Sequence, residues 1–303
     1  MREIRIGTRG SQLALKQTEI ITGIISRSWP DMKISVVKIK TSGDVNMSAF
    51  STEPSGIKGM FTLEIEKALL NHEIDFAVHS LKDLPAEMNE KLPIIAYSKR
   101  ADPFDALVLS EKAKSENIIG SSSLRRRLQL ERLYPEKKII PIRGNVNTRI
   151  KRLDDGEFSG LVLAAAGLER LGLKNRITKI FSPEEIMPAP GQGILACQGR
   201  SGENYFYLDC VNDEISRDCA LAERSFARAL SAGCNVPVGA YAVVEGENLI
   251  LRGRFIDERT RKFYSGIISG FRSEAGLLGK KLAEKIFSTK IKKANRLFHY
   301  PIR

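Results

Sequence analysis

The segment on which this chain depends, residues 76–85, reads FAVHSLKDLP. Residues 75–78 are mainly apolar, which is typical of a strand buried on both faces of a parallel sheet. Pro85 prevents a long helix from following. Because ligands of open α/β sheets bind beyond the carboxyl ends of the strands, we expect the polar residues here to form a site. These are His79, Ser80, Lys82 and Asp83. From this segment alone, a surface loop with solvated charges is an equal alternative.

Length and composition indicate an ordinary globular protein. The chain has 303 residues, of which 42% are hydrophobic and 28% charged, enough for two or three domains. The apolar run at residues 161–166 is far too short to cross a bilayer, so we expect a cytoplasmic protein with no membrane partner. The four cysteines show no C-x-x-C spacing and no neighbouring histidine cluster. Neither a zinc site nor a disulfide framework is therefore predicted. A reactive thiol at one of the four cysteines is compatible with this pattern.

The net charge of +12 admits two kinds of partner. A nucleic-acid binder would gather its basic residues on one face and interleave aromatics, but aromatics are only 7% of this chain. The arginines instead recur after strands, which favours a small polyanionic ligand bound by guanidinium forks. The basic residues from Lys290 to Arg303 are predicted to form a solvated tail.

Two turns have the pattern of an anion site at the start of a helix. Residues 7–11, GTRGS, separate a predicted strand at 4–6 from a predicted helix at 12–27. Residues 120–123, GSSS, precede a predicted helix at 124–134 whose first turn carries three arginines. Free backbone N–H groups and the helix dipole favour an anion at such a turn, while cations there need an anionic partner. The alternatives are simple capping turns and a solvated basic helix face.

The order of the remaining elements predicts the architecture. Strands and helices alternate up to about residue 210, with crossing segments near 99–103 and 187–193. A long loop at 46–59 is expected to be either a lid or locally disordered. This pattern predicts an α/β fold with two periplasmic-binding-protein-like (type II) lobes, hinge crossings and a small C-terminal α+β domain. The expected domains are 1–98 with 191–210, 99–190, and 211–303. In the last one, helices are predicted at 213–230 and 273–287.

The loop after the first of these helices reads SAGCNVPVG, residues 231–239. Gly233 can supply a left-handed C-cap and Pro237 bars continuation of the helix, so Cys234 should be held on an ordered loop. Taken alone, Cys234 is more simply explained as an idle thiol, because cysteine is often buried.

Six motifs together give the chain a family resemblance. In order they are HSLKDLP, GSSSLRRR, RGNVNTR, LAAAGLERLG, PGQG and SAGCNVPVG. The set resembles the porphobilinogen deaminase (hydroxymethylbilane synthase) family from residue 4 to about residue 239. The resemblance implies three domains around a cleft, a dipyrromethane cofactor on a loop cysteine, and a monomer. It also implies an enzyme that joins four porphobilinogen molecules head to tail, releases four ammonia, and hydrolyses off the linear tetrapyrrole.

The resemblance also implies roles for single residues. Cys234 would carry the cofactor by a thioether, and Asp83 would be the catalytic carboxylate at the pyrrole nitrogens. The implied cofactor-binding residues are Lys82, Asp83, Ser122, Arg125, Arg126, Arg143 and Arg149. The implied substrate-binding residues are Arg9, Ser80, Lys58, Phe61, Arg143, Arg149 and Arg170. Each porphobilinogen brings two carboxylates, which agrees with the many arginines at strand ends.

Some positions depart from the family pattern. Ser231-Ala232 stands where Glu-Gly is familiar, Ser42 where Arg is common, and residues 197–200, CQGR, replace a more usual Glu-Cys-Arg.

The main alternative function is a non-catalytic two-lobed receptor for an organic anion, which would need neither Cys234 nor a third domain. A nucleic-acid binder is a more distant alternative, and its affinity for DNA would depend steeply on salt concentration.

Overall fold

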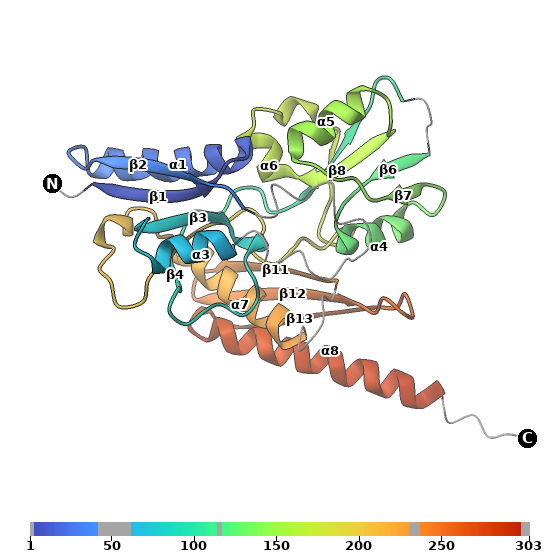
Figure 1. The fold of residues 1–303 in the computed structure, drawn as a ribbon. Coiled ribbons are helices and arrows are strands. Elements are labelled where there is room, and N and C mark those ends of the chain that lie inside the picture. Colours follow the sequence, from blue (N-terminus) through green and yellow to red (C-terminus); the bar gives the residue numbers. More distant parts are fainter. Residues whose placement is uncertain (1–2, 42–61, 114–116, 231–236, 298–303) are drawn as a thin grey trace, which may run out of the picture.

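The computed structural model describes residues 3–41, 62–113, 117–230 and 237–297, with side chains as far as Lys290. These residues form three sheets (Figure 1). The first lobe is built on the sheet β2-β1-β3-β10-β4, in which β1 pairs parallel with β2 and β3 while β10 runs antiparallel to its neighbours. Its elements are β1 (Ile4–Arg9), α1 (Gln12–Ser28), β2 (Ile34–Ile39), α3 (Leu63–Leu70), β3 (Phe76–Ser80), β4 (Ile94–Tyr97) and β10 (Leu195–Gly199).

The second lobe repeats this arrangement in the sheet β7-β6-β8-β5-β9. Here β6 pairs parallel with β7 and β8, and β5 lies antiparallel against β8. Its elements are β5 (Asp105–Leu109), β6 (Ile118–Gly120), α4 (Leu124–Leu133), β7 (Lys138–Ile140), α5 (Val146–Asp154), β8 (Gly160–Ala164), α6 (Ala165–Arg170) and β9 (Lys179–Ile180). In each lobe the antiparallel strand is the one that the chain reaches directly from a crossing segment.

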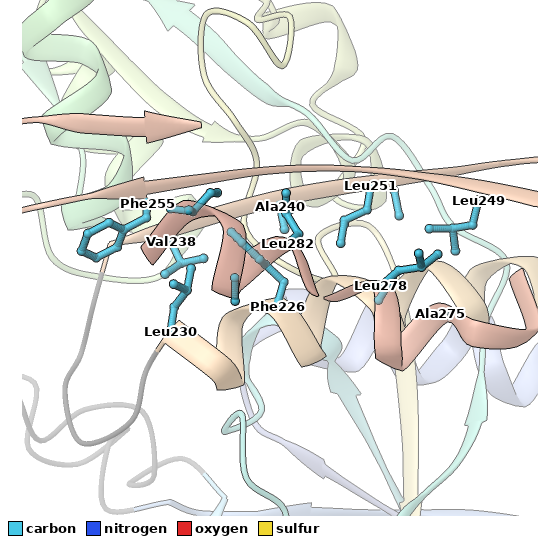
Figure 2. Packing of buried hydrophobic residues seen from close by; sticks show 14 of the residues in the cluster. Phe226, Leu230, Val238, Ala240, Leu249, Leu251, Phe255, Ala275, Leu278 and Leu282 are labelled. Atoms are coloured by element: carbon cyan, nitrogen blue, oxygen red, sulfur yellow. The ribbon is translucent and has the colours of Figure 1, made fainter. Parts of the chain in front are cut away.

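The C-terminal part packs two helices on one face of an antiparallel sheet, as Figure 2 shows. Its elements are α7 (Glu214–Leu230), β11 (Val238–Glu245), β12 (Asn248–Ile256), β13 (Phe263–Phe271) and α8 (Ala275–Leu297). Phe226 of α7 and Leu282 of α8 are fully buried against the sheet. A Cβ on Gly253 would lie 2.5 Å from the Phe226 ring, so this glycine allows the helix to approach the sheet.

One buried carboxylate connects the C-terminal part to both crossing segments. Glu223 of α7 is fully buried and accepts hydrogen bonds from four donors. Two come from Arg100 of the first crossing, at 2.7 and 3.2 Å. The others are the backbone N–H groups of Gly191, in the return crossing, and Ala242, in β11, each at 2.7 Å. The charge of Arg100 and the two amides offset the cost of burying this carboxylate.

The predicted fold class is confirmed by the two α/β sheets and the separate helix-and-sheet part. The exact domain boundaries remain a prediction. Within the described residues, no helix is both long and apolar enough to cross a membrane.

Several local predictions were wrong. His79 and Ser80 belong to β3, because that strand pairs with β10 as far as Ser80. Strand β10 and helix α5 were not predicted at all. The last helix runs ten residues further than expected, and the Nζ atom of Lys290 lies 2.8 Å from a carboxylate oxygen of Asp257 and over the ring of Phe255. Lys290 is therefore part of a packed helix rather than a solvated tail.

Residues 197–200, which depart from the family pattern, are all buried. Cys197 and Gln198 are fully buried in β10, and the Gln198 amide donates to Glu66 at 3.2 Å and to the Leu92 carbonyl at 3.1 Å. A Cβ on Gly199 would lie 2.6 Å from Ile95 and 2.7 Å from Tyr205. Gly199 is therefore suited to its place in the sheet, whereas the Oε1 atom of Gln198 is buried without a hydrogen-bond partner among the described residues.

Candidate functional site

The two lobes meet where α1 and α5 begin. Ser11 caps α1 by accepting from the Ala14 N–H at 3.3 Å, and Asn145 caps α5 by accepting from the Thr148 N–H at 2.9 Å. The Asn147 amide then donates to the side-chain oxygen of Gln12. Two helix N-termini, each with a partial positive charge, are thus brought together across the lobes.

Asp83 lies in this region between cations of both lobes. The 3₁₀ turn Leu81–Asp83 follows β3 and is anchored by the fully buried Leu81, whose N–H donates to the Ile194 carbonyl at 3.0 Å. Asp83 itself is exposed, and Lys82 is half-buried. Burial and the nearby Arg126 lower the pKa of Lys82 to about 8, while Asp83 acts in the opposite direction.

Arg149 of α5 approaches the same carboxylate from the second lobe. Its Nε donates to the Gly144 carbonyl at 2.7 Å, which fixes the side chain along the start of the helix. Burial and the charge of Arg126 lower the pKa of Arg149 to about 10, and Asp83 opposes that shift. The structure therefore brings together Lys82, Asp83, Arg126 and Arg149.

The two arginines that open α4 have an anionic partner inside the protein. Asp105 at the start of β5 is fully buried and lies 2.9 Å from Arg125 and 2.7 Å from Arg126. Burial would raise the pKa of Asp105, but the two guanidinium groups hold it well below its usual range. The sequence predicted that the arginines opening α4 require an anionic partner, and Asp105 is such a partner for two of them.

Some polar atoms at the start of α4 are buried without a hydrogen-bond partner. The Nε atoms of Arg125 and Arg127 are buried and have no hydrogen-bond partner among the described residues, as is also true of the Ser121 hydroxyl. Ser121 was not among the predicted site residues; its place in the GSSS turn is the signal that could have identified it. Buried donors without partners are costly, so this turn and the start of α4 are less stable than they would be with each donor paired.

The other predicted binding residues lie at strand and helix ends of both lobes. Ser80, at the end of β3, accepts from the Gln17 amide at 2.7 Å, and the exposed Ser122 donates to the Ile142 carbonyl. Arg170, at the end of α6, donates to the Gly193 carbonyl at 2.6 Å. Burial lowers its pKa to about 10, against the effect of Glu169. Arg9 ends β1 half-buried, and Arg143 follows β7 on the surface.

Three predicted residues, Lys58, Phe61 and Cys234, lie outside the described residues, as does the loop at 46–59. Cys234 belongs to the connection between α7 and β11. Of the three described cysteines, Cys197 and Cys219 are buried. Burial raises the pKa of both thiols, that of Cys219 to about 12, which makes them poor nucleophiles.

The donor set fits a compact polyanion. The exposed carboxylate of Asp83 interacts electrostatically with Lys82 of one lobe and Arg149 of the other, and the pKa values of Lys82, Arg149 and Arg170 are lowered mainly by burial. Carboxylates bound here would stabilise the charged forms of these side chains. A dipyrromethane, with two carboxylates on each ring, has the complementary charge.

Comparisons with known proteins identify the family. A model described as "Porphobilinogen deaminase, dipyromethane cofactor binding domain" matches residues 4–207, and the model of the C-terminal domain matches residues 218–288. A porphobilinogen deaminase of Ruminiclostridium josui is 47% identical over 96% of this chain and 99% of its own length. That of Nostoc sp. is 42% identical over 93% and 90%.

Solved structures of low similarity include a substrate-binding protein of an amino acid ABC transporter. It is 13% identical, with a TM-score of 0.38 over 72% of this chain and 92% of its own. The family models and the relatives cover nearly the whole sequence. The chain therefore belongs to the porphobilinogen deaminase family.

Proposed function

We propose that this protein is a hydroxymethylbilane synthase, which joins four porphobilinogen molecules head to tail on a covalently held dipyrromethane and then releases the linear tetrapyrrole. The observation that carries the proposal is the position of Asp83, whose charge acts to raise the pKa of Lys82 of its own lobe and of Arg149 of the other. The cations of the protein can bind the carboxylates of a ligand. Asp83 can then act on a positively charged group of the same ligand.

The proposed mechanism divides the work between two kinds of residue. Lys82, Arg126, Arg149 and the arginines at the strand ends bind acetate and propionate groups by charge-assisted hydrogen bonds. Asp83 accepts hydrogen bonds from pyrrole N–H groups, where positive charge develops as ammonia leaves, and takes part in removing the ring proton after coupling. When bound, the dipyrromethane supplies the terminal ring carbon to which the first porphobilinogen is joined. Cys234 would hold that group.

A combined mass and activity measurement tests the proposal. The protein is produced in a host that makes porphobilinogen, its denatured mass is measured, and it is then incubated with porphobilinogen. We expect one covalent adduct of dipyrromethane size, heavier species as substrate is added, and formation of hydroxymethylbilane. A bare chain that binds porphobilinogen without converting it would favour the receptor alternative. A cytoplasmic location and a monomeric state remain predictions.

Replacing Arg149 by leucine should weaken binding of substrate and intermediates. A hydrogen bond to a charged group contributes about 1.5–3 kcal/mol, so we expect KM to rise roughly tenfold to a hundredfold. Arg152 on the same helix offers a matched control, because its guanidinium pairs with exposed Glu157 at 2.7 Å. Arg152→Leu should change KM by no more than about twofold, since surface ion pairs contribute little.

Steady-state kinetics on both variants, with thermal unfolding to confirm that each is folded, decide the matter. Equal losses in Arg149→Leu and Arg152→Leu would show that bulk positive charge, rather than a specific contact, attracts the substrate.

A further inference from the structure

Gln192 lies at the junction of both lobes, in the PGQG segment of the return crossing. Its side chain is 1% exposed. Its Oε1 atom accepts from Lys82 Nζ of the first lobe at 3.2 Å and from Arg126 Nη2 of the second lobe at 3.4 Å. Its Nε2 atom donates to the Pro103 carbonyl at 2.8 Å and to Asp105 Oδ1 at 2.9 Å. One amide therefore contacts both lobes and the first crossing.

The amide can satisfy these four neighbours in only one orientation. Its oxygen faces two cations and its NH₂ group faces two acceptors, so a flipped amide would place donors against Lys82 and Arg126 and an acceptor against Asp105. Because the flipped state loses all four contacts, the electrostatics of the neighbours fix the side chain.

The backbone on either side is fixed as well. Gly191 (φ +74°) and Gly193 (φ +93°) both adopt the left-handed region, which favours glycine. A Cβ on Gly191 would lie 2.7 Å from the side chain of Leu81, the residue before Lys82, and one on Gly193 would lie 2.4 Å from the Ala101 carbonyl oxygen. The Cα of Gln192 is thus held close to the site turn and to the first crossing at once.

We propose that Gln192 is a positioning residue, which holds the Lys82 ammonium of one lobe at a set distance from the Arg126 guanidinium of the other. The proposal rests on the proposed function, because these two cations are part of the site that binds the carboxylates. A single shared acceptor offsets their mutual repulsion, so the two halves of the anion site stay in register without a ligand between them.

The pKa of Lys82 is a measurable property that depends on its hydrogen bond to Gln192. The charged groups around it are Arg125 and Arg126 of α4, Asp105 of β5 and Asp83 of its own turn. Together with burial they give Lys82 a pKa of about 8, so the side chain is charged below that pH and loses its charge above it. Without the Gln192 oxygen, the ammonium loses a hydrogen bond that favours the charged form, and its pKa should fall by about one unit.

The test compares Gln192→Met with Gln192→Glu. Competitive acetylation with acetic anhydride across a pH series, read at the Lys82 peptide by mass spectrometry, measures the protonation of that side chain in the protein as purified. We expect the Lys82 midpoint to move down in Gln192→Met and up in Gln192→Glu, where a carboxylate replaces the amide. The alkaline limb of kcat/KM should move the same way, with kcat/KM about tenfold lower in Gln192→Met.

Two further variants complete the design. Gln198→Met removes a buried amide in β10 that bonds to Glu66 and Leu92, so it should lower stability without moving the Lys82 midpoint. Lys82→Arg keeps its charge and should remove the alkaline limb. If Gln192→Met does not fold, Gln192→Glu alone decides. An unchanged Lys82 midpoint in every folded Gln192 variant overturns the proposal. Because acetylation needs no turnover, this result is independent of whether the protein makes hydroxymethylbilane.

Discussion

Asp83→Asn should slow the formation of hydroxymethylbilane by at least ~10²–10⁴, the range expected for loss of a general acid–base group. Asparagine can still accept a hydrogen bond from a pyrrole N–H, but it carries no charge to stabilise the cation that forms as ammonia leaves. Asp83 is exposed on a turn anchored by Leu81, so the variant should keep its fold and its affinity for substrate. Asp83→Glu keeps the charge at a displaced position and should retain more activity.

Single-turnover formation of enzyme-bound intermediates, on protein shown to carry the cofactor, measures this effect apart from substrate binding. Asp155→Asn, at the exposed aspartate that forms the C-cap of α5, is the matched control and should turn over normally. Near-normal turnover in Asp83→Asn would remove Asp83 from the mechanism. His79 would then be the next candidate for proton transfer, as a weak base, because burial lowers the pKa of its imidazole to about 4 and keeps the ring neutral.

Cys234→Ala should abolish activity completely and give a folded chain without a covalent adduct. The physical reason lies in the other thiols. Cys197 and Cys219 are buried, with raised pKa values that suppress the nucleophilic thiolate. Cys210 is exposed, and its thiol donates to the Tyr207 carbonyl at 3.3 Å. Cys234 is the one that the family motif marks.

Denatured-protein mass spectrometry of Cys234→Ala and Cys210→Ala gives the comparison. Cys210→Ala removes an exposed thiol and should carry one adduct and full activity. An intact adduct in Cys234→Ala, or its appearance on a peptide containing another cysteine, would show that the motif had been assigned the wrong role.

The sequence predicted those features that depend on local pattern. The strands ending near Arg9 and Asp83, and the GSSS turn before α4, follow from short apolar runs and turn residues that need no distant partner. Strand β10 was missed because Leu195–Gly199 is a five-residue segment whose conformation is set by pairing with β3 and β4, far away in the chain. The predicted lobes nevertheless appear in the structure, because the alternation of strands and helices is itself local.

The sequence predicted the cations of the candidate site, but it did not predict the polar side chains that hold these cations in place. That an arginine follows a strand is visible in the sequence, but that Asp105, twenty residues earlier, pairs with both Arg125 and Arg126 depends on how β5 packs beside α4. Gln192 was visible only as part of a motif. Three of its four contacts come from segments about ninety or more residues distant, and the fourth is with Arg126 of α4. Long-range polar networks of this kind leave no periodic signal in the sequence.

The buried carboxylate of Glu223 has a consequence for how the molecule loses its structure. Arg100 and Gly191, in the two crossing segments, donate to it, so detaching the C-terminal part would leave a guanidinium and a backbone amide without their acceptor. Partly unfolded states that keep the lobes but release α7 are therefore high in free energy. Denaturation should be a single cooperative transition in which the hinge and the C-terminal part melt together.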